Sequence, residues 1–205
     1  MTSIVVVSAG LSVPSSTRLL ADRLAAATAG ALEEVDVTTV ELRDLAHELT
    51  DHLLTGFPGP DLAAAIDAVR RADGLIVVTP VFAASYSGLF KTFFDVLEQG
   101  TLDGTPVLIA ATAGTARHSL VLEHALRPLF AYLHAVVVPT GVFAATEDFG
   151  DAGLDARIAR AAGELAVLVG KVDPSGAATT RRRTVEDELA DPTPFELLLE
   201  RASTA

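Results

Sequence analysis

Short apolar runs alternate along the chain with segments of helical spacing. Apolar residues that are β-branched or alternate with polar ones predict five strands, and apolar residues three or four apart predict five helices. The expected strands are Ile4–Ser8, Val35–Leu42, Leu75–Thr79, Val107–Thr112 and Val136–Val142. The expected helices are Ser16–Thr28, Leu62–Ala72, Leu89–Leu97, Leu120–Leu133 and Leu154–Val169.

This alternation predicts an α/β fold, a doubly wound sheet of five parallel strands with helices on both faces. Right-handed crossovers favour the flavodoxin-like strand order 2-1-3-4-5. The alternating pattern of Val35–Leu42 suits a strand near an edge. In this order the switch point lies between the first and third strands, where open α/β sheets bind ligands at the carboxyl ends. The loops that follow these strands are therefore the first places to search for a site.

The texture of the chain changes after residue 170. Asp173-Pro174-Ser175-Gly176 breaks the last helix, and Arg181–Arg183 precede an acidic run. Phe195–Leu199 is a short apolar segment with no partner of its own. We predict one domain, residues 1–170, and a C-terminal tail, residues 171–205, that is partly disordered or docks on a neighbouring surface through this segment.

Composition excludes several classes of protein. The formal net charge of −12 argues against a nucleic-acid surface and against attraction to an anionic membrane. No apolar run reaches the length of a membrane span, and no signal peptide is recognisable, so the expected location is the cytoplasm. The chain has no cysteine, and its five histidines lack the spacing of zinc ligands, so no metal site is expected.

The loop between the first strand and the first helix has the features of a phosphate site. Hydroxyl groups cluster at its end, beside the unpaired amides of the first helical turn. The first acidic residue, Asp22, lies beyond that turn, and no GxGxxG or P-loop pattern occurs, which favours a single terminal phosphate. The alternative is that a serine here is only an N-cap. The candidate residues are Ser8, Leu11, Ser15, Ser16 and Thr17.

Two further loops, after the third and fourth strands, are suited to a planar ring. The first is small and apolar apart from Phe82, and the second offers amides and His118 to the polar edge of a ring. Their candidate residues are Pro80, Val81, Phe82, Ala83, Ala84 and Ser85, and Thr112, Ala113, Gly114, Thr115 and His118. A phosphate and a flat ring together indicate a mononucleotide, and flavin mononucleotide (FMN) fits best.

The chain also resembles a known family in these loops. Thr79-Pro80-Val81-Phe82-Ala83-Ala84-Ser85-Tyr86-Ser87-Gly88-Leu89-Phe90-Lys91 is similar to the P-x-Y-N-x-S-x-x-G-x-L-K signature of NAD(P)H-dependent FMN reductases. Thr112–His118, followed by Leu126-Arg127-Pro128-Leu129, resembles the T-G-G-x-x-x-H and L-[KR]-P segment of reductases that serve two-component alkanesulfonate monooxygenases. The chain departs from these patterns at Phe82, at Ala83 in place of asparagine, and at Ala113 in place of glycine.

The resemblance implies that FMN accepts hydride from NADH or NADPH and leaves as reduced flavin for a flavin-dependent monooxygenase. It further implies a homodimer or homotetramer, and a one-residue π-bulge near His124. Donors near the pyrimidine edge stabilise the charge that builds there during hydride transfer, so His118 is the candidate catalytic residue. The sequence leaves the preference between NADH and NADPH open.

Two other functions stay open at this point. One is a flavodoxin-like electron carrier that keeps its FMN, although the absence of Trp weakens this reading because carriers usually cover the ring with large aromatics. The other is an NAD(P)H-dependent quinone or azo reductase that keeps its flavin. Lys91 and Asp95 stand one helical turn apart, and we interpret them as a surface ion pair and not as catalytic groups.

Overall fold

The computed structural model describes residues 1–170 and residue 194. The predicted tail, 171–205, therefore lies outside the described residues except for Pro194. Arg181–Arg183 and the apolar segment Phe195–Leu199 are among the residues not described.

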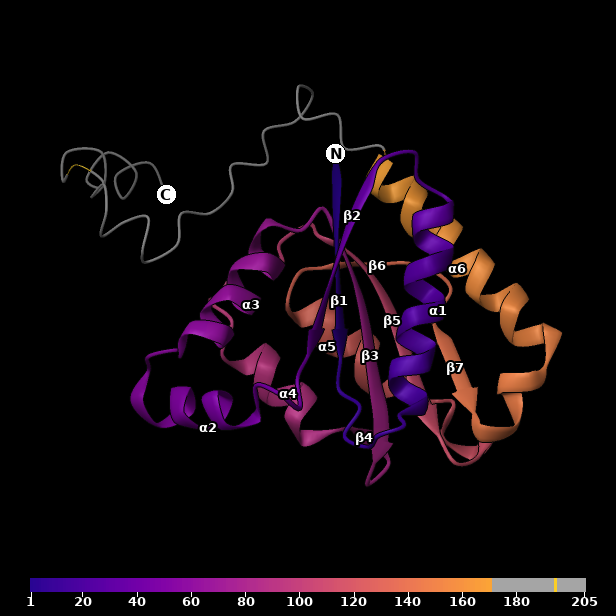
Figure 1. The fold of residues 1–205 in the computed structure, drawn as a ribbon, viewed down its shortest axis with the longest axis horizontal. Coiled ribbons are helices and arrows are strands. Elements are labelled where there is room, and N and C mark those ends of the chain that lie inside the picture. Colours follow the sequence, from indigo (N-terminus) through magenta and orange to yellow (C-terminus); the bar gives the residue numbers. More distant parts are fainter. Residues whose placement is uncertain (171–193, 195–205) are drawn as a thin grey trace. The chain divides into compact units, whose positions relative to one another are not determined.

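A parallel sheet forms the centre of the domain (Figure 1). Its path runs β2-β1-β3-β5-β6, with β7 also paired to β5 and β4 paired antiparallel to β3. This order confirms the predicted flavodoxin-like topology and places Val35–Glu41 at an edge. The strands are β1 Thr2–Ser8, β2 Val35–Glu41, β3 Gly74–Phe82, β4 Ser85–Tyr86, β5 Pro106–Ala113, β6 Val136–Val137 and β7 Val142–Ala145.

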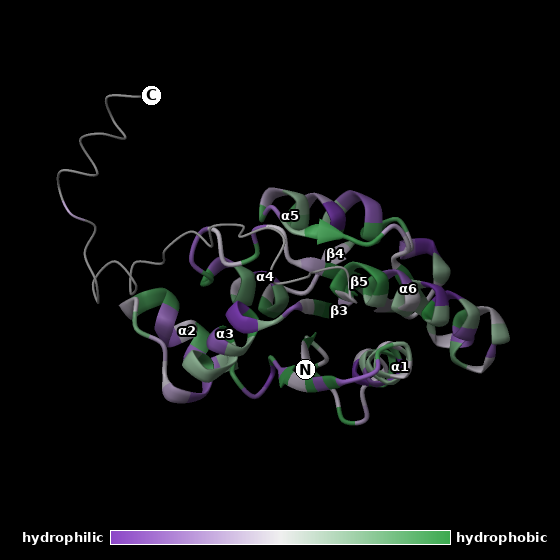
Figure 2. Cartoon of the chain, turned by 90° about the horizontal axis from the view of Figure 1, so that it is seen from above, coloured by the Kyte–Doolittle hydropathy of each residue, from purple (hydrophilic) through white to green (hydrophobic). Residues whose placement is uncertain are grey.

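Helices cover both faces of the sheet. Figure 2 looks from above and shows α1 and α5 on opposite sides of β3 and β5. The helices are α1 Ser16–Gly30, α2 Ala46–Thr55, α3 Pro60–Arg71, α4 Gly88–Asp95, α5 Arg127–Tyr132 and α6 Ala152–Gly170. Shorter segments are η1 Ala116–His118, η2 Leu122–Leu126 and η3 Thr146–Gly150.

The core has two halves, one on each face of the sheet. Along β1, Ile4 and Val6 belong to the half that contains buried residues of α1 and α6. Val5 and Val7 belong to the half that contains buried residues of α2 to α5. This alternation follows from the period of two in a strand, and it fixes which helix meets which face.

One helix, α2, was not predicted from the sequence. Its ten residues are mostly polar, and Leu49 is the one buried among them. The segment therefore has too few apolar residues at helical spacing to predict a helix. A tertiary contact supports it instead, because Glu48 on α2 accepts a hydrogen bond of 2.8 Å from the backbone N–H of Leu62 on α3.

The fifth predicted strand is also wrong as a single element, because it is divided into β6 and β7. Pro139 lies between the two parts and has no N–H to donate to the ladder. Side chains from helices bond the interrupted backbone. Arg127 donates to the carbonyls of Val138 at 3.2 Å and Pro139 at 3.1 Å. Glu164 accepts from the N–H of Thr140 at 2.7 Å and from its hydroxyl at 2.8 Å.

The expected π-bulge near His124 is confirmed. Segment η2 is a π-helix, and the N–H of Arg127 donates to the carbonyl of Leu122, five residues earlier. Pro128 comes directly after Arg127 and has no N–H, so the α-helical ladder cannot continue unbroken through this point. Arg127 also bonds Glu123 at 2.7 Å, and this hydrogen bond holds the pKa of the Glu123 carboxyl below its ordinary value.

Candidate functional site

The carboxyl edge of the sheet brings the three predicted loops together. Ser8 at the end of β1 is level with Val78 on β3, and Pro80 is level with Thr112 on β5. The hydroxyls of Thr17 and Thr112, both about 3% exposed, bond each other at 2.8 Å. This bond ties the first turn of α1 to the end of β5, so the phosphate loop and the ring loops share one site. In Figure 1 they meet at the end of the sheet marked by β4.

The three hydroxyls predicted to donate to a phosphate differ in their surroundings. Ser15 is the N-cap of α1, and its Oγ accepts from the N–H of Arg18 at 3.2 Å. It can still donate its own proton. Thr17 is buried and its hydroxyl is bonded to that of Thr112, so it links the helix start to β5, and its predicted contact with a phosphate stays a prediction. Ser16 is exposed and begins the helix. The N-cap alternative thus holds for Ser15, while Ser16 keeps a free hydroxyl.

The loop fits a phosphate for reasons beyond its hydroxyls. The first turn of α1 carries no acidic residue. Ser8 Oγ is buried at the end of β1 and has no hydrogen-bond partner among the described residues. Arg18, the nearest cation in the sequence, bonds Asp22 and Glu41 and so is occupied. An anion at this loop would therefore be bound by backbone amides and small hydroxyls, as is common where a helix begins.

Gly10 allows the loop to fold back over the start of α1. A Cβ at this position would lie 2.2 Å from Ser15 Oγ and 3.2 Å from Thr17 Cβ. The first distance is too short for any real contact, so a side chain at residue 10 displaces the N-cap. Leu11, the next residue, is 50% exposed and supplies an apolar rim beside the loop.

We predict that Gly10→Ala lowers the free energy of unfolding by about 1 kcal/mol, because the N-cap bond of Ser15 is lost. FMN affinity is expected to fall about tenfold with it, since the same displacement moves the amides of the loop. Gly163→Ala is the matched control, because nothing lies within 4 Å of its added Cβ. In this helix position alanine should stabilise by roughly 0.5–1 kcal/mol. Urea denaturation and FMN titration check both variants; equal stability of Gly10→Ala and wild type contradicts the prediction.

The predicted apolar loop after the third strand is in fact a β-hairpin. β3 continues to Phe82 and pairs with β4, so Val81 lies opposite Tyr86 and Phe82 opposite Ser85. Ala83 and Ala84 form the two-residue turn, with φ of 47° and 65°. Positive φ at both central residues is the pattern of a type I′ turn, which usually takes Asn-Gly. The hairpin therefore presents Phe82, 47% exposed, on a rigid strand end.

The base of this hairpin is held by a further threonine of β3, Thr79. Thr79 is fully buried, and its Oγ1 accepts from the N–H of Ser87 at 3.0 Å. Ser87 in turn caps α4, because its Oγ accepts from the N–H of Phe90 at 3.2 Å. The chain from β3 through the hairpin to α4 is thus bonded at both ends, which limits its movement relative to the sheet.

The second ring loop follows β5. Thr112 and Ala113 still belong to the strand, and Ala113 is partly buried opposite Ala145. Thr112 bonds Thr17 through its hydroxyl, and its predicted contact with the ring stays a prediction. Gly114 and Thr115 are exposed, and the short helix η1 follows with His118 exposed at its end. The predicted polar residues 114, 115 and 118 thus lie at the open edge of the sheet.

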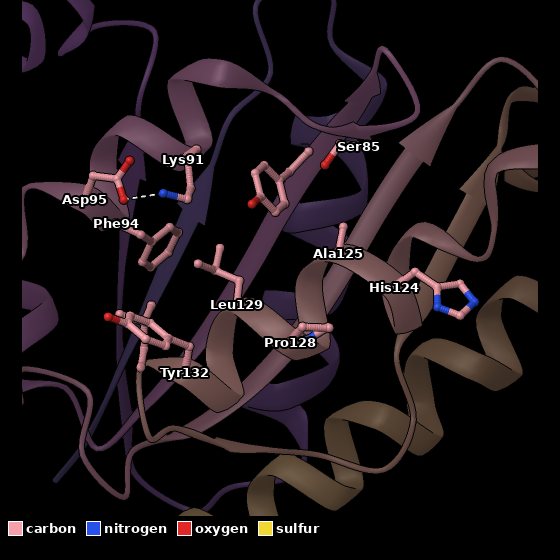
Figure 3. A pocket seen from close by; sticks show the side chains of 11 residues that line it. Ser85, Lys91, Phe94, Asp95, His124, Ala125, Pro128, Leu129 and Tyr132 are labelled. Atoms are coloured by element: carbon pink, nitrogen blue, oxygen red, sulfur yellow. Dashed lines mark hydrogen bonds and ion pairs between the residues drawn. The ribbon is translucent and has the colours of Figure 1, made fainter.

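A cavity of about 440 Å³ adjoins the hairpin on the α4 side (Figure 3). Its lining includes Ser85 and Tyr86 of β4, together with residues of α4, η2 and α5. Lys91 and Asp95 form an ion pair at one end of it, and His124 lies at the other. The expectation that Lys91 and Asp95 pair on the helix surface is confirmed.

Sequence reasoning missed two structural contributors to the site. The bond between Thr17 and Thr112 joins residues 95 positions apart, and no local pattern signals it. The hairpin turn was not predicted because Ala-Ala contains none of the usual turn residues.

In the described part of the chain, no helix combines the length and the apolar character that crossing a bilayer requires.

Comparison with known proteins now identifies the family. The profile of the NADPH-dependent FMN reductase family matches residues 2–150. An FMN reductase (NADPH) of Pseudomonas aeruginosa is 41% identical over 172 residues, which cover 82% of this chain and 92% of that protein. The NADH-dependent FMN reductase SfnF of Pseudomonas fluorescens is 41% identical, over 82% of this chain and 91% of its own length.

A solved structure agrees with these relatives. An oxidoreductase from Corynebacterium diphtheriae superposes with a TM-score of 0.81 at 54% identity, covering 83% of this chain and 97% of that one. The chain belongs to the NADPH-dependent FMN reductase family. The resemblance in its two ring loops is therefore confirmed at the level of the whole domain.

Proposed function

We propose that this member of the FMN reductase family transfers hydride from NAD(P)H to FMN and supplies the reduced flavin to a partner flavin-dependent monooxygenase. The proposal rests on one observation: the candidate phosphate loop and the candidate ring loops lie together at the carboxyl edge of the sheet. An acid-free helix start with a free Ser16 hydroxyl lies beside the hairpin and the loop after β5, joined by the bond between Thr17 and Thr112.

The reaction balances as NAD(P)H + H⁺ + FMN giving NAD(P)⁺ and reduced FMN. Bound FMN supplies the hydride-accepting chemistry. The protein's part is to hold the phosphate at the start of α1 and the ring against Pro80 to Ser85. We propose that the amides of Gly114 and Thr115, together with His118, stabilise charge at the polar edge of the ring.

The site favours release of the flavin over its retention. Flavin carriers cover the ring with large aromatics, whereas the hairpin offers Phe82 and two alanines. Tyr132 is 83% exposed, and Tyr86 lies in the wall of the cavity beside α4. A ring site with so few aromatic side chains over it suits FMN that enters and leaves as a substrate.

The proposal extends to the setting of the enzyme. A partner monooxygenase is supported by the similarity of Thr112–His118 and Leu126–Leu129 to reductases of two-component systems. The cytoplasm is the proposed location, and a homodimer or homotetramer is the proposed assembly. For the part of the chain outside the described residues, we keep the proposal of a separate tail, 171–205.

An oxidation assay with NADH and with NADPH, each with and without added FMN, tests the proposal. The proposed function requires turnover that depends on FMN and is saturable in it. Tight FMN binding with no turnover would indicate the electron carrier. A ping-pong pattern with a quinone far better than free FMN as acceptor would indicate the quinone or azo reductase.

A further inference from the structure

Arg117 differs from nearly all other basic side chains in the described part of the chain. Each Lys and Arg there has a carboxylate within ion-pair distance, with two exceptions, Arg117 and Arg160. In a protein with a net charge of −12, a cation without an acidic partner is unusual. Its positive field is not neutralised by the protein and is available to an anionic ligand.

The position of Arg117 connects it to the reaction. It lies in η1, on the loop that follows β5, between Thr115 and His118. Residues 112–120 contain no acid, and the first carboxylate after them, Glu123, is bonded to Arg127. Arg117 is exposed at the same open edge as the predicted polar contacts of the ring.

The ligand that needs such a cation is the reduced nicotinamide dinucleotide. Its diphosphate carries two negative charges, which the acidic protein as a whole repels. The guanidinium group binds phosphate oxygens through two parallel hydrogen bonds and keeps its charge at all working pH values. When nicotinamide lies over the flavin, the diphosphate is the nearest anionic group of the dinucleotide to the ring, whereas the 2′-phosphate of NADPH is on the distant adenosine ribose.

We propose that Arg117 binds the diphosphate of NADH and NADPH and thereby positions the nicotinamide over the flavin ring. The inference rests on the proposed function, since it assigns the second substrate of the same site. It predicts that NADH and NADPH depend on Arg117 equally, because the diphosphate is common to both.

The test compares Arg117→Gln with Arg160→Gln. Arg160 is equally unpaired and exposed, but it lies on α6, far along the chain from the ring loops. Two quantities are measured: KM for NADH and NADPH, and the dissociation constants of NAD⁺ and NADP⁺ by calorimetry in the presence of FMN. Arg117→Gln should raise all four about tenfold or more, the usual loss for a charge-assisted hydrogen bond. The substitution should also reduce the salt dependence of these four constants. The FMN affinity of Arg117→Gln, and the same four constants in Arg160→Gln, should stay near the wild-type values.

Two results overturn the inference. Unchanged constants in Arg117→Gln, or changes no larger than those in Arg160→Gln, remove any role for Arg117 in binding. A rise confined to NADPH and NADP⁺ assigns the arginine to the 2′-phosphate instead. Because the calorimetric constants need no turnover, they decide the inference even if the wild-type protein fails to oxidise NAD(P)H with FMN, which is the separate failure of the proposed function.

Discussion

Replacing Ser16 with aspartate is expected to raise the dissociation constant of FMN about 100-fold without a loss of folding stability. The new carboxylate stands in the first turn of α1, at the proposed phosphate site. At an effective dielectric constant of about 20, two charges roughly 5 Å apart repel by about 3 kcal/mol. The same carboxylate complements the helix dipole, so the free energy of unfolding should stay constant or rise by a few tenths of a kcal/mol.

Ser16→Asn is the matched control, because it has the size of aspartate without the charge. It should keep FMN affinity within a few-fold of wild type. Fluorescence titration of FMN and urea denaturation measure the two effects separately. Two results would contradict this prediction: Ser16→Asp lowers folding stability as much as FMN affinity, or both variants lower FMN affinity equally. In either case the new charge does not act on a bound phosphate, and the start of α1 is not the phosphate site.

Replacing Phe90 with alanine is expected to destabilise the domain by about 3–5 kcal/mol, the largest stability effect that we predict. The side chain is fully buried in α4, directly beneath the ring hairpin. Its ring centroid lies 5.9 Å from that of Tyr86 on β4, 4.8 Å from Phe94 and 6.2 Å from Phe130. The substitution therefore opens a cavity inside an aromatic cluster and removes the support under the hairpin.

Two control substitutions separate packing from aromatic content. Phe90→Leu keeps most of the volume and should cost about 1–2 kcal/mol. Tyr132→Ala removes an aromatic ring that is 83% exposed and should change stability by less than about 0.5 kcal/mol. Thermal and urea denaturation of the wild type and the three variants give the order of their stabilities. A Phe90→Ala protein as stable as Phe90→Leu would mean that the cluster is not tightly packed.

The fold was largely predictable because its signals are local and strong. The buried part of β3, residues 74–79, is a mostly apolar run, and α3 and α4 show clear helical periods. Where the sequence failed, tertiary contacts decide the structure. The helix α2 depends on Leu49 and on the contact of Glu48 with α3. The break between β6 and β7 is supported by side chains of two helices, Arg127 of α5 and Glu164 of α6.

The meeting of the three candidate loops at one edge of the sheet was predictable, and the contacts within these loops were less so. Strand order alone placed the loops after β1, β3 and β5 at one edge. The sequence could not show which of the candidate hydroxyls bond each other, and Thr17 and Thr112 are such a pair. The turn at Ala83 and Ala84 has a backbone conformation that alanine rarely adopts, so composition pointed to an open loop. Strain of this kind is often found beside functional sites.

The central claim is that the start of α1 binds the phosphate of FMN, and the comparison of FMN with riboflavin tests it most directly. Riboflavin has the same ring without the phosphate. The wild-type protein should bind riboflavin about 100-fold more weakly than FMN, and Ser16→Asp should abolish most of that difference by weakening FMN alone. Equal affinity of the wild-type protein for FMN and riboflavin would contradict the claim.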